Sequence, residues 1–241
     1  MTVEKIVLEK REEVATITFN RPEKGNAVDL EMMEDLNQKL LDVAANGSFR
    51  VLVLQGRGDH FCVGRDPGRT RPQNAAEWAE VLTQIIRVNQ QLSTFPGISL
   101  ALVQGRAFGF GCGLAVQSDV TVAADNARFA FPEIKAGLPP TIVMSYLGRW
   151  IPRKKAFELV ITGSEMDARE AERLGIVSRI VPSDQLADEG KRWISLFLNQ
   201  DADALRTCKR FFLDTADLTS EDASRYGAAL LANLMSSRSK G

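Results

Sequence analysis

The chain has 241 residues, 44% of them hydrophobic, which is enough for one sizeable buried core. Its 30 basic and 31 acidic residues leave a formal charge of −1, which argues against a bulk attraction to nucleic acid or to an anionic membrane. The three cysteines are odd in number and lack CxxC spacing, so we expect neither a disulfide framework nor a thiolate metal site. Nothing has the pattern of a signal peptide or a membrane span, and we therefore predict a cytoplasmic protein that binds neither nucleic acid nor membranes.

The N-terminal part alternates strand and helix patterns. Residues 6–19 place two β-branched apolar runs around a polar turn, which predicts a β-hairpin. Residues 29–44 have the period of an amphipathic helix with Asp29 as its N-cap. Its predicted apolar face consists of Leu30, Met33, Leu36, Leu40 and Leu41. The short apolar run at 51–54 predicts a buried parallel strand, so a β-α-β order is already present.

The remainder changes from strands to helices. The polar, breaker-rich residues 67–76 predict a surface loop before a helix at 77–92. Strands are expected at 98–103, 120–123 and 129–131. Helices are expected near 142–149, 153–161, 167–174, 183–199 and 201–215, with a last one running through Leu234. We predict an α/β core over residues 1–182 and a C-terminal helical lobe over residues 183–241.

A glycine cluster follows the strand at 98–103. Gly109, Gly111 and Gly113 spell GxGxG, but Leu114 stands where the third glycine of a dinucleotide fingerprint should be, so that motif fails. Unpaired backbone N–H groups at a helix start could still hold a polarised carbonyl oxygen, although close helix packing explains the glycines equally well. A second strand exit, residues 56–66, could bring another N–H to form an oxyanion hole.

Five segments resemble the enoyl-CoA hydratase/isomerase (crotonase) family in order and spacing, and together they cover nearly the whole chain. They are NRPEKGNAV (20–28), FCVGRD (61–66), GRAFGFGCGL (105–114), FPEIKAGLPP (131–140) and EMDAREAERLGIVSRIVP (165–182). The resemblance implies a crotonase-like (ClpP/crotonase) spiral of ββα units with a C-terminal helical lobe. It further implies an acyl-CoA thioester as substrate, no metal or redox cofactor, and a homotrimer or a dimer of trimers.

The same resemblance assigns roles to residues of the two glycine-bearing loops. The backbone N–H groups of Arg65 and Phe110 would form the oxyanion hole. The CoA-binding residues would be Lys24, Ala27, Val28, Gly64, Arg65 and Asp66, although a solvated surface charge explains Lys24 and Arg65 as well. The acyl pocket would be lined by Gly109, Phe110, Gly113, Pro132, Leu138 and Pro139.

Glu133 is the candidate acid/base residue, because it matches the second of the two glutamates of the family's hydratases. Without the resemblance it would be an ordinary first-turn glutamate after Pro132. Gly113 stands where those hydratases carry their first glutamate, which favours isomerisation by one proton-shuttling carboxylate over hydration. Hydration with a replacement group from residues 67–76, thioester hydrolysis, decarboxylation, carbon–carbon cleavage and a non-catalytic acyl-CoA-binding scaffold remain alternatives.

Overall fold

A computed structural model describes residues 4–66, 68 and 72–238. Its main sheet has six strands in the order β1-β2-β3-β4-β6-β9, and the strands are parallel except for the antiparallel pair β1–β2. Their bounds are Ile6–Arg11 (β1), Val14–Phe19 (β2), Val51–Gly56 (β3), Ile98–Val103 (β4), Val120–Ala124 (β6) and Arg179–Val181 (β9). The predicted hairpin at 6–19 is confirmed, and Glu12 makes its tight turn with a φ of 50°.

A smaller sheet of three strands stands beside the first. Strand β7 (Arg128–Ala130) lies between β5 (Arg106–Phe108) and β8 (Met166–Asp167), parallel to β5 and antiparallel to β8. The sequence patterns did not predict β5, β8 or β9. These strands have two or three residues each, which is too short for alternation to be visible.

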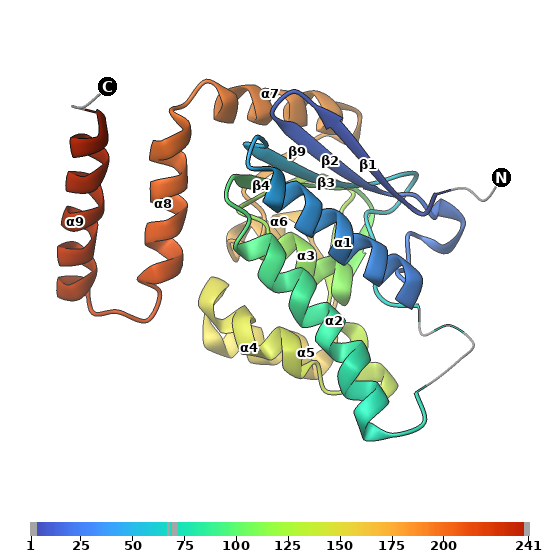
Figure 1. The fold of residues 1–241 in the computed structure, drawn as a ribbon. Helices are drawn as coiled ribbons and strands as arrows, with labels where there is room; N and C mark the ends of the chain where they lie inside the picture. The colour runs from blue at the N-terminus through green and yellow to red at the C-terminus, as the bar shows by residue number, and fades with distance from the viewer. Residues whose placement is uncertain (1–3, 67, 69–71, 239–241) are drawn as a thin grey trace.

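Nine helices and three short 3-10 turns are found in the described residues (Figure 1). The helices are α1 (Leu30–Asn46), α2 (Ala75–Ser93), α3 (Phe110–Gln117), α4 (Thr141–Trp150), α5 (Arg153–Thr162), α6 (Ala168–Arg173), α7 (Leu186–Leu198), α8 (Ala202–Asp214) and α9 (Ser220–Arg238). The 3-10 turns are η1 (Pro22–Lys24), η2 (Pro132–Ala136) and η3 (Ser183–Gln185).

Helix α1 begins where the sequence predicted. The carboxylate of Asp29 accepts a hydrogen bond from the backbone N–H of Met32 at 3.0 Å, which caps the helix. The predicted apolar face is only partly correct, because Leu30 and Leu41 are 38% and 49% exposed. The face that packs on the sheet consists of Met32, Met33, Leu36, Leu40 and Val43, and the other two leucines lie beyond its edges.

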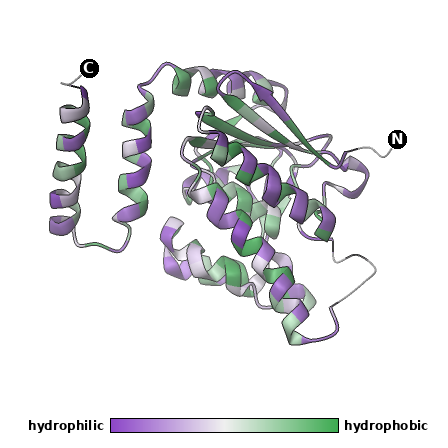
Figure 2. Ribbon diagram, viewed as in Figure 1, coloured by the Kyte–Doolittle hydropathy of each residue, from purple (hydrophilic) through white to green (hydrophobic). Residues whose placement is uncertain are grey.

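The main sheet is buried on both faces, which explains the continuous apolar runs of β3 and β4. Leu52 and Leu54 point to the larger core beneath α1, α2 and α3, whereas Val51 and Val53 point to a second core against α7. Figure 2 shows the central strands as largely hydrophobic, with polar residues concentrated on the outer helix faces.

The C-terminal helices differ in how they join the core. Helix α7 packs on β3, β4 and β6, whereas α9 packs chiefly on α8, with which it forms a hairpin that stands to one side (Figure 1). One buried contact ties α8 to the core: Lys209 Nζ donates to Asp119 Oδ2 at 2.7 Å and to the Gly97 carbonyl at 3.1 Å. The division into a core at 1–182 and a lobe at 183–241 stays a prediction.

Candidate active site

The glycine cluster links β5 to α3 and leaves free donors at the helix start. Gly109 has a φ of 50°, a left-handed conformation that glycine adopts most readily, and its N–H donates to the Ala130 carbonyl at 2.8 Å. Phe110 is the first residue of α3, so its N–H has no intrahelical partner. No acceptor for this N–H is present in the described part of the chain.

The second strand exit meets the first. Val28 donates from its N–H to the Gly64 carbonyl, and its own carbonyl accepts from Asp66, both at 2.9 Å. Arg65 N–H lies between these bonds and has no acceptor among the described residues. Gly64 has a φ of 108°, and a Cβ built on it would lie 3.1 Å from the Phe108 carbonyl oxygen and 3.9 Å from Phe110 N. The two predicted oxyanion-hole loops are therefore neighbours.

Glu133 projects into this junction from η2, which begins with Pro132 after the core residue Phe131. A Cβ built on Gly109 would lie 2.9 Å from Glu133 Oε1 and 4.0 Å from the Gly64 Cα. The other carboxylate oxygen, Oε2, is buried without a hydrogen-bond partner in the described residues. Burial raises the pKa of the Glu133 carboxyl, and a contact with its own backbone N–H lowers it by less.

Tyr146 stands beside Gly113, one turn further along α3. A Cβ built on Gly113 would lie 2.6 Å from the Tyr146 hydroxyl oxygen, which comes from α4. Burial raises the pKa of Tyr146, and electrostatic interactions with Cys112 and Glu133 raise it further, so the phenol is neutral. The sequence analysis did not identify Tyr146, because no motif connects it to the glycine cluster.

An open groove of about 420 Å³ lies between α2, α3 and α4. Its lining residues are Ile86, Asn89, Gln90, Ser93, Gln117, Thr141, Ile142, Ser145 and Tyr146. None of the predicted acyl-pocket residues lines this groove. Gly109, Phe110, Gly113 and Pro132 instead lie around Glu133 and Tyr146, whereas Leu138 is 61% exposed and Pro139 is also exposed.

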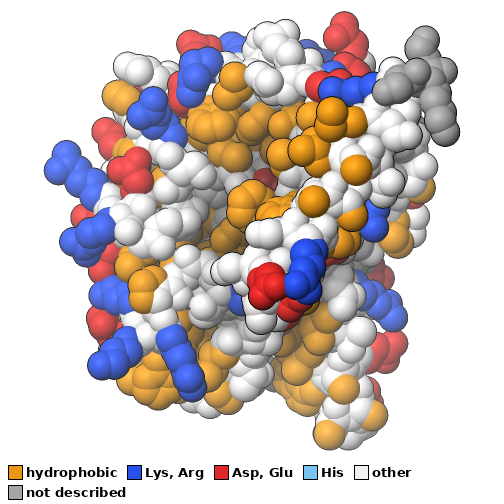
Figure 3. Space-filling model, turned by 90° about the vertical axis from the view of Figure 1, so that its left-hand side faces the viewer, with side chains coloured by type: hydrophobic (Ala, Val, Ile, Leu, Met, Phe, Trp, Pro, Cys, Tyr) orange, Lys and Arg blue, Asp and Glu red, His pale blue; other side chains and the backbone are white. Residues whose placement is uncertain are grey.

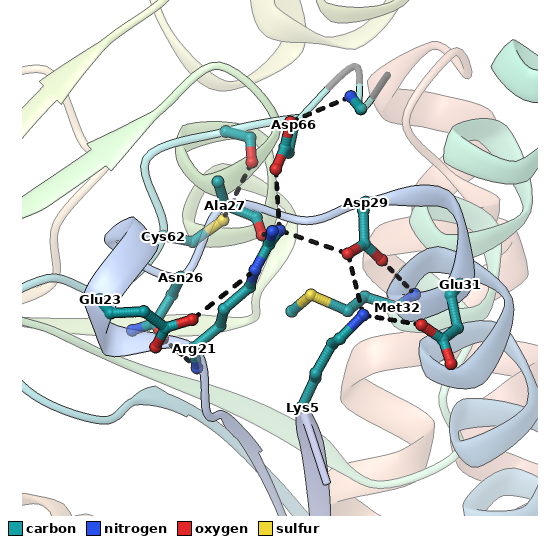
Figure 4. Close-up of polar contacts among 12 residues, drawn as sticks. Lys5, Arg21, Glu23, Asn26, Ala27, Asp29, Glu31, Met32, Cys62 and Asp66 are labelled. Carbon is teal, nitrogen blue, oxygen red and sulfur yellow. Dashed lines mark hydrogen bonds and ion pairs between the residues drawn. The ribbon is translucent and has the colours of Figure 1, made fainter. Parts of the chain in front are cut away.

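Arg21 links the two segments that carry the predicted CoA-binding residues, and Figure 4 shows its contacts with Ala27 and Asp66. Arg21 Nη1 donates to the Ala27 carbonyl at 3.0 Å and pairs with Asp66 Oδ2 at 2.9 Å and Asp29 Oδ2 at 3.3 Å. The hydrogen bond from Gly68 N–H lowers the pKa of Asp66 most, and Arg21 adds to this effect. The Asp66 carboxylate thus has partners within the chain.

Asn26 braces the same loop, a role that the sequence analysis missed. It is fully buried with a φ of 61°, and its amide group donates to the carbonyls of Arg57 and His60. Asparagine tolerates this left-handed conformation better than most residues, which was the one available signal. His60 accepts at Nδ1 from Arg106 N–H at 3.2 Å, a structural contact.

Two basic side chains remain available to an anion near this loop. Lys24 is exposed, and its charge contributes to lowering the pKa of Asp66. Arg65 is half-buried, burial lowers the pKa of its guanidinium, and no carboxylate pairs with it among the described residues. The Val28 side chain lies in the core, so only its backbone can face a ligand.

Comparisons with known proteins identify the family of the chain. The sequence profile described as enoyl-CoA hydratase/isomerase matches residues 9–241. The chain belongs to this family. A Mycobacterium bovis protein named "Probable enoyl-CoA hydratase echA8" is 34% identical over 211 residues, which are 87% of this chain and 81% of the relative.

Solved structures confirm the fold. The crystal structure of an enoyl-CoA hydratase from Mycobacterium smegmatis matches with a TM-score of 0.92 at 29% identity, covering 97% of this chain and 91% of that one. The human enoyl-CoA hydratase domain-containing protein 3 matches with a TM-score of 0.90 at 26% identity, covering 95% and 91%. The chain has the predicted crotonase fold with a C-terminal helical region, and its family acts on acyl-CoA thioesters.

Two kinds of feature are absent from the described residues. No helix there is long and apolar enough to cross a membrane. Within the same residues, no group of three or more histidine, cysteine, aspartate or glutamate side chains could hold a metal ion.

Proposed function

We propose that the chain is an acyl-CoA-transforming enzyme in which Glu133 moves a proton at the α-carbon of a thioester. The backbone N–H groups of Arg65 and Phe110 would bind the thioester oxygen. The observation that carries this proposal is the meeting of an unpartnered, buried carboxylate oxygen with two unpartnered amide donors at one junction. Buried polar atoms are normally hydrogen-bonded, so such a group favours a ligand site.

The chemistry follows from the charges that develop during the reaction. Removal of the α-proton turns the thioester carbonyl into an enolate, and two amides aimed at its oxygen stabilise that charge by roughly 3 kcal/mol per donor or more. The raised pKa of Glu133 brings the carboxylate closer to the range in which it can both accept and return a proton. The CoA thioester is the substrate, and the reaction as proposed uses no separate cofactor.

The two basic side chains extend the proposal to the CoA portion. Arg65 and Lys24 would hold anionic groups of the nucleotide. The backbone of Ala27, Val28 and Gly64 would line the same path, and Asp66 would act indirectly by fixing the loop through Arg21. The acyl group would lie over Gly109, Gly113 and Pro132.

The experiment that tests the function compares wild type with Glu133→Gln on crotonyl-CoA and on a 3-enoyl-CoA, following the absorbance of the conjugated thioester. A Glu133-dependent gain from the 3-enoyl substrate would establish isomerisation, and a Glu133-dependent loss from crotonyl-CoA would establish hydration. Equal activity of the two proteins would refute the role of Glu133. Binding without turnover by either protein would favour the scaffold alternative.

Taken by itself, the absent side chain at Gly113 favours isomerisation, because one carboxylate suffices to carry a proton between C2 and C4 of an enoyl thioester. Hydration needs a second polar group to hold the attacking water. Loop 67–76 offers no carboxylate in the sequence, and residues 67 and 69–71 lie outside the described residues. Thioester hydrolysis, decarboxylation and carbon–carbon cleavage use the same oxyanion hole and remain alternatives.

We also propose that the chain assembles as a trimer or a dimer of trimers. Apolar side chains gather on the face from which the C-terminal hairpin projects (Figure 3). Helices α8 and α9 expose Phe212 by 76%, Leu231 by 56% and Met235 by 61%. Contiguous apolar surface of this kind is typical of protein interfaces. Light scattering after size exclusion should give three or six times the chain mass, and a monomer would contradict the proposal.

A further inference from the structure

The unassigned group nearest to Glu133 is the hydroxyl of Tyr146. Tyr146 is one of the residues that line the open groove, and a Cβ built on Gly113 would lie 2.6 Å from its hydroxyl oxygen. No described residue donates a hydrogen bond to this hydroxyl or accepts one from it. A phenol hydroxyl can both donate and accept a hydrogen bond, so one without a protein partner favours a polar ligand atom beside Tyr146.

Glu133 and Tyr146 are spaced by one turn of α3. The carboxylate lies over Gly109 and the hydroxyl over Gly113, and Gly113 N–H donates to the Gly109 carbonyl at 2.9 Å. The charge of Glu133 contributes to raising the pKa of Tyr146, so the two groups lie within electrostatic range of each other. A single oxygen atom between them could hydrogen-bond both groups, since each such bond spans roughly 2.7 Å.

We propose that Tyr146 is a further catalytic residue, whose hydroxyl and the Glu133 carboxylate together hold the water molecule that adds to an enoyl-CoA. This inference rests on the proposed function and specifies its reaction as hydration. Tyr146 stays a neutral phenol, so it orients the water and does not act as the base. It supplies the second polar group that Gly113 lacks.

The step balances without any further reactant. The water oxygen forms a bond to C3 while the C2–C3 π electrons move into the thioester, giving an enolate held by the amides of Arg65 and Phe110. Glu133 accepts one proton from the water and delivers it to C2, which returns the carboxylate and yields a 3-hydroxyacyl thioester. Tyr146 keeps its own proton throughout.

The test separates water addition from proton transfer. Hydration is followed on crotonyl-, hexenoyl-, decenoyl- and cinnamoyl-CoA by loss of conjugated absorbance. Exchange of the α-proton into D₂O is followed on the saturated thioesters by mass spectrometry, because it needs Glu133 and the oxyanion hole but adds no water. Tyr146→Phe should lose hydration by about 100-fold or more while exchange stays within a few-fold of wild type.

Two further variants keep the test decisive. Gly113→Ala should reproduce the loss of hydration, because its added Cβ would displace the Tyr146 hydroxyl. Combining Gly113→Ala with Tyr146→Phe should lose little more hydration than Tyr146→Phe alone, since the next atom of the Tyr146 ring lies 3.9 Å from that Cβ. Tyr226→Phe, which changes the other tyrosine of the sequence, should leave both assays unchanged. Where Tyr146→Phe does not fold, Gly113→Ala alone carries the comparison.

The outcomes distinguish the two proposals. Wild type that exchanges α-protons but hydrates none of the substrates overturns the water site and leaves the proposed function standing. The water site is also overturned if Tyr146→Phe hydrates as fast as wild type. It is overturned as well if a folded Tyr146→Phe variant loses hydration and α-proton exchange to the same extent. Absence of exchange in the wild type counts against the proposed function itself.

Discussion

The Glu133 carboxylate occupies the space that a side chain on Gly109 would need, since a Cβ built on Gly109 would lie 2.9 Å from Glu133 Oε1. Gly109→Ala should therefore displace the carboxylate and also strain the backbone at a φ of 50°, which costs an L-residue about 1–2 kcal/mol. We expect a lower melting temperature and a loss of kcat that exceeds any effect on KM. The control is Gly148→Ala in α4, where an added Cβ meets nothing within 4 Å. Gly148→Ala should leave the stability of the fold unchanged or raise it. Equal kcat values in the two variants would show that the space beside Gly109 is not needed to position the Glu133 carboxylate.

The raised pKa of Glu133 has a kinetic consequence. If the ionised carboxylate removes the α-proton, kcat/KM falls as the pH drops through the pKa of Glu133 in the free enzyme. Burial raises that pKa above the ordinary 4.5, so the acidic limb of the profile should lie at higher pH than for an exposed glutamate. The measurement is kcat/KM for α-proton exchange across the pH range in which the protein stays folded. A limb at or below 4.5 would show that another group titrates.

The same pKa predicts how stability depends on pH. The folded state holds the Glu133 proton more tightly than the unfolded chain, so wild type loses stability as pH rises from the unfolded pKa through the folded one. Glu133→Gln has no such loss. The variant should be more stable than wild type at neutral pH, and the gain should vanish below the unfolded pKa. Urea unfolding of both proteins at several pH values measures the difference in their free energies of unfolding. Glu172→Gln, at an exposed glutamate, is the control. A stability gain in Glu133→Gln that does not change with pH would show that the gain comes from side-chain packing and not from the titration of Glu133.

Elements whose signal is local were predictable from the sequence. The hairpin at 6–19 has alternation over two strands, and Asp29 is a capping residue immediately before an apolar-periodic segment. The buried runs at 51–54 and 98–103 were long enough to indicate parallel strands, and α7 and α8 lie within two to three residues of their predicted bounds. The family-level features of the site were also visible, because the five motifs each occupy one contiguous segment.

What the sequence could not predict depends on contacts between distant segments. Leu30 and Leu41 fit the helical period but lie outside the strip that α1 presents to the sheet. Tyr146 is 33 positions from Gly113, and only the docking of α4 on α3 places its hydroxyl there. The resemblance placed Leu138 and Pro139 in the acyl pocket; both are exposed in the single chain after the turn at Gly137, and their role in the pocket stays a prediction.

Arg65 has two proposed roles that can be separated. Its backbone N–H would bind the thioester oxygen, and its half-buried guanidinium would bind an anionic group of CoA. Arg65→Met keeps the amide and removes the charge, so KM should rise about tenfold, equivalent to ~1.4 kcal/mol, with kcat nearly unchanged. Arg57→Met, at an exposed arginine of the same strand exit, is the matched control and should leave both constants unchanged. If Arg65→Met lowers kcat and leaves KM unchanged, the Arg65 side chain positions the oxyanion-hole loop and does not bind CoA.

The contact between Lys209 and Asp119 predicts how α8 is anchored. Burial lowers the pKa of Lys209, and the Asp119 carboxylate opposes that effect in an ion pair whose side chains are 7% and 23% exposed. Among the described residues, Lys209→Met would leave Asp119 with the two donors of Ser99, and losing one partner of a buried pair costs about 3 kcal/mol. Urea unfolding should show this loss and limited proteolysis should show faster cleavage near α8. Lys191→Met, which breaks an exposed pair with Asp188, should change stability by less than about 0.5 kcal/mol. Similar losses in both variants would mean that α8 is held by its apolar contacts and not by the buried pair.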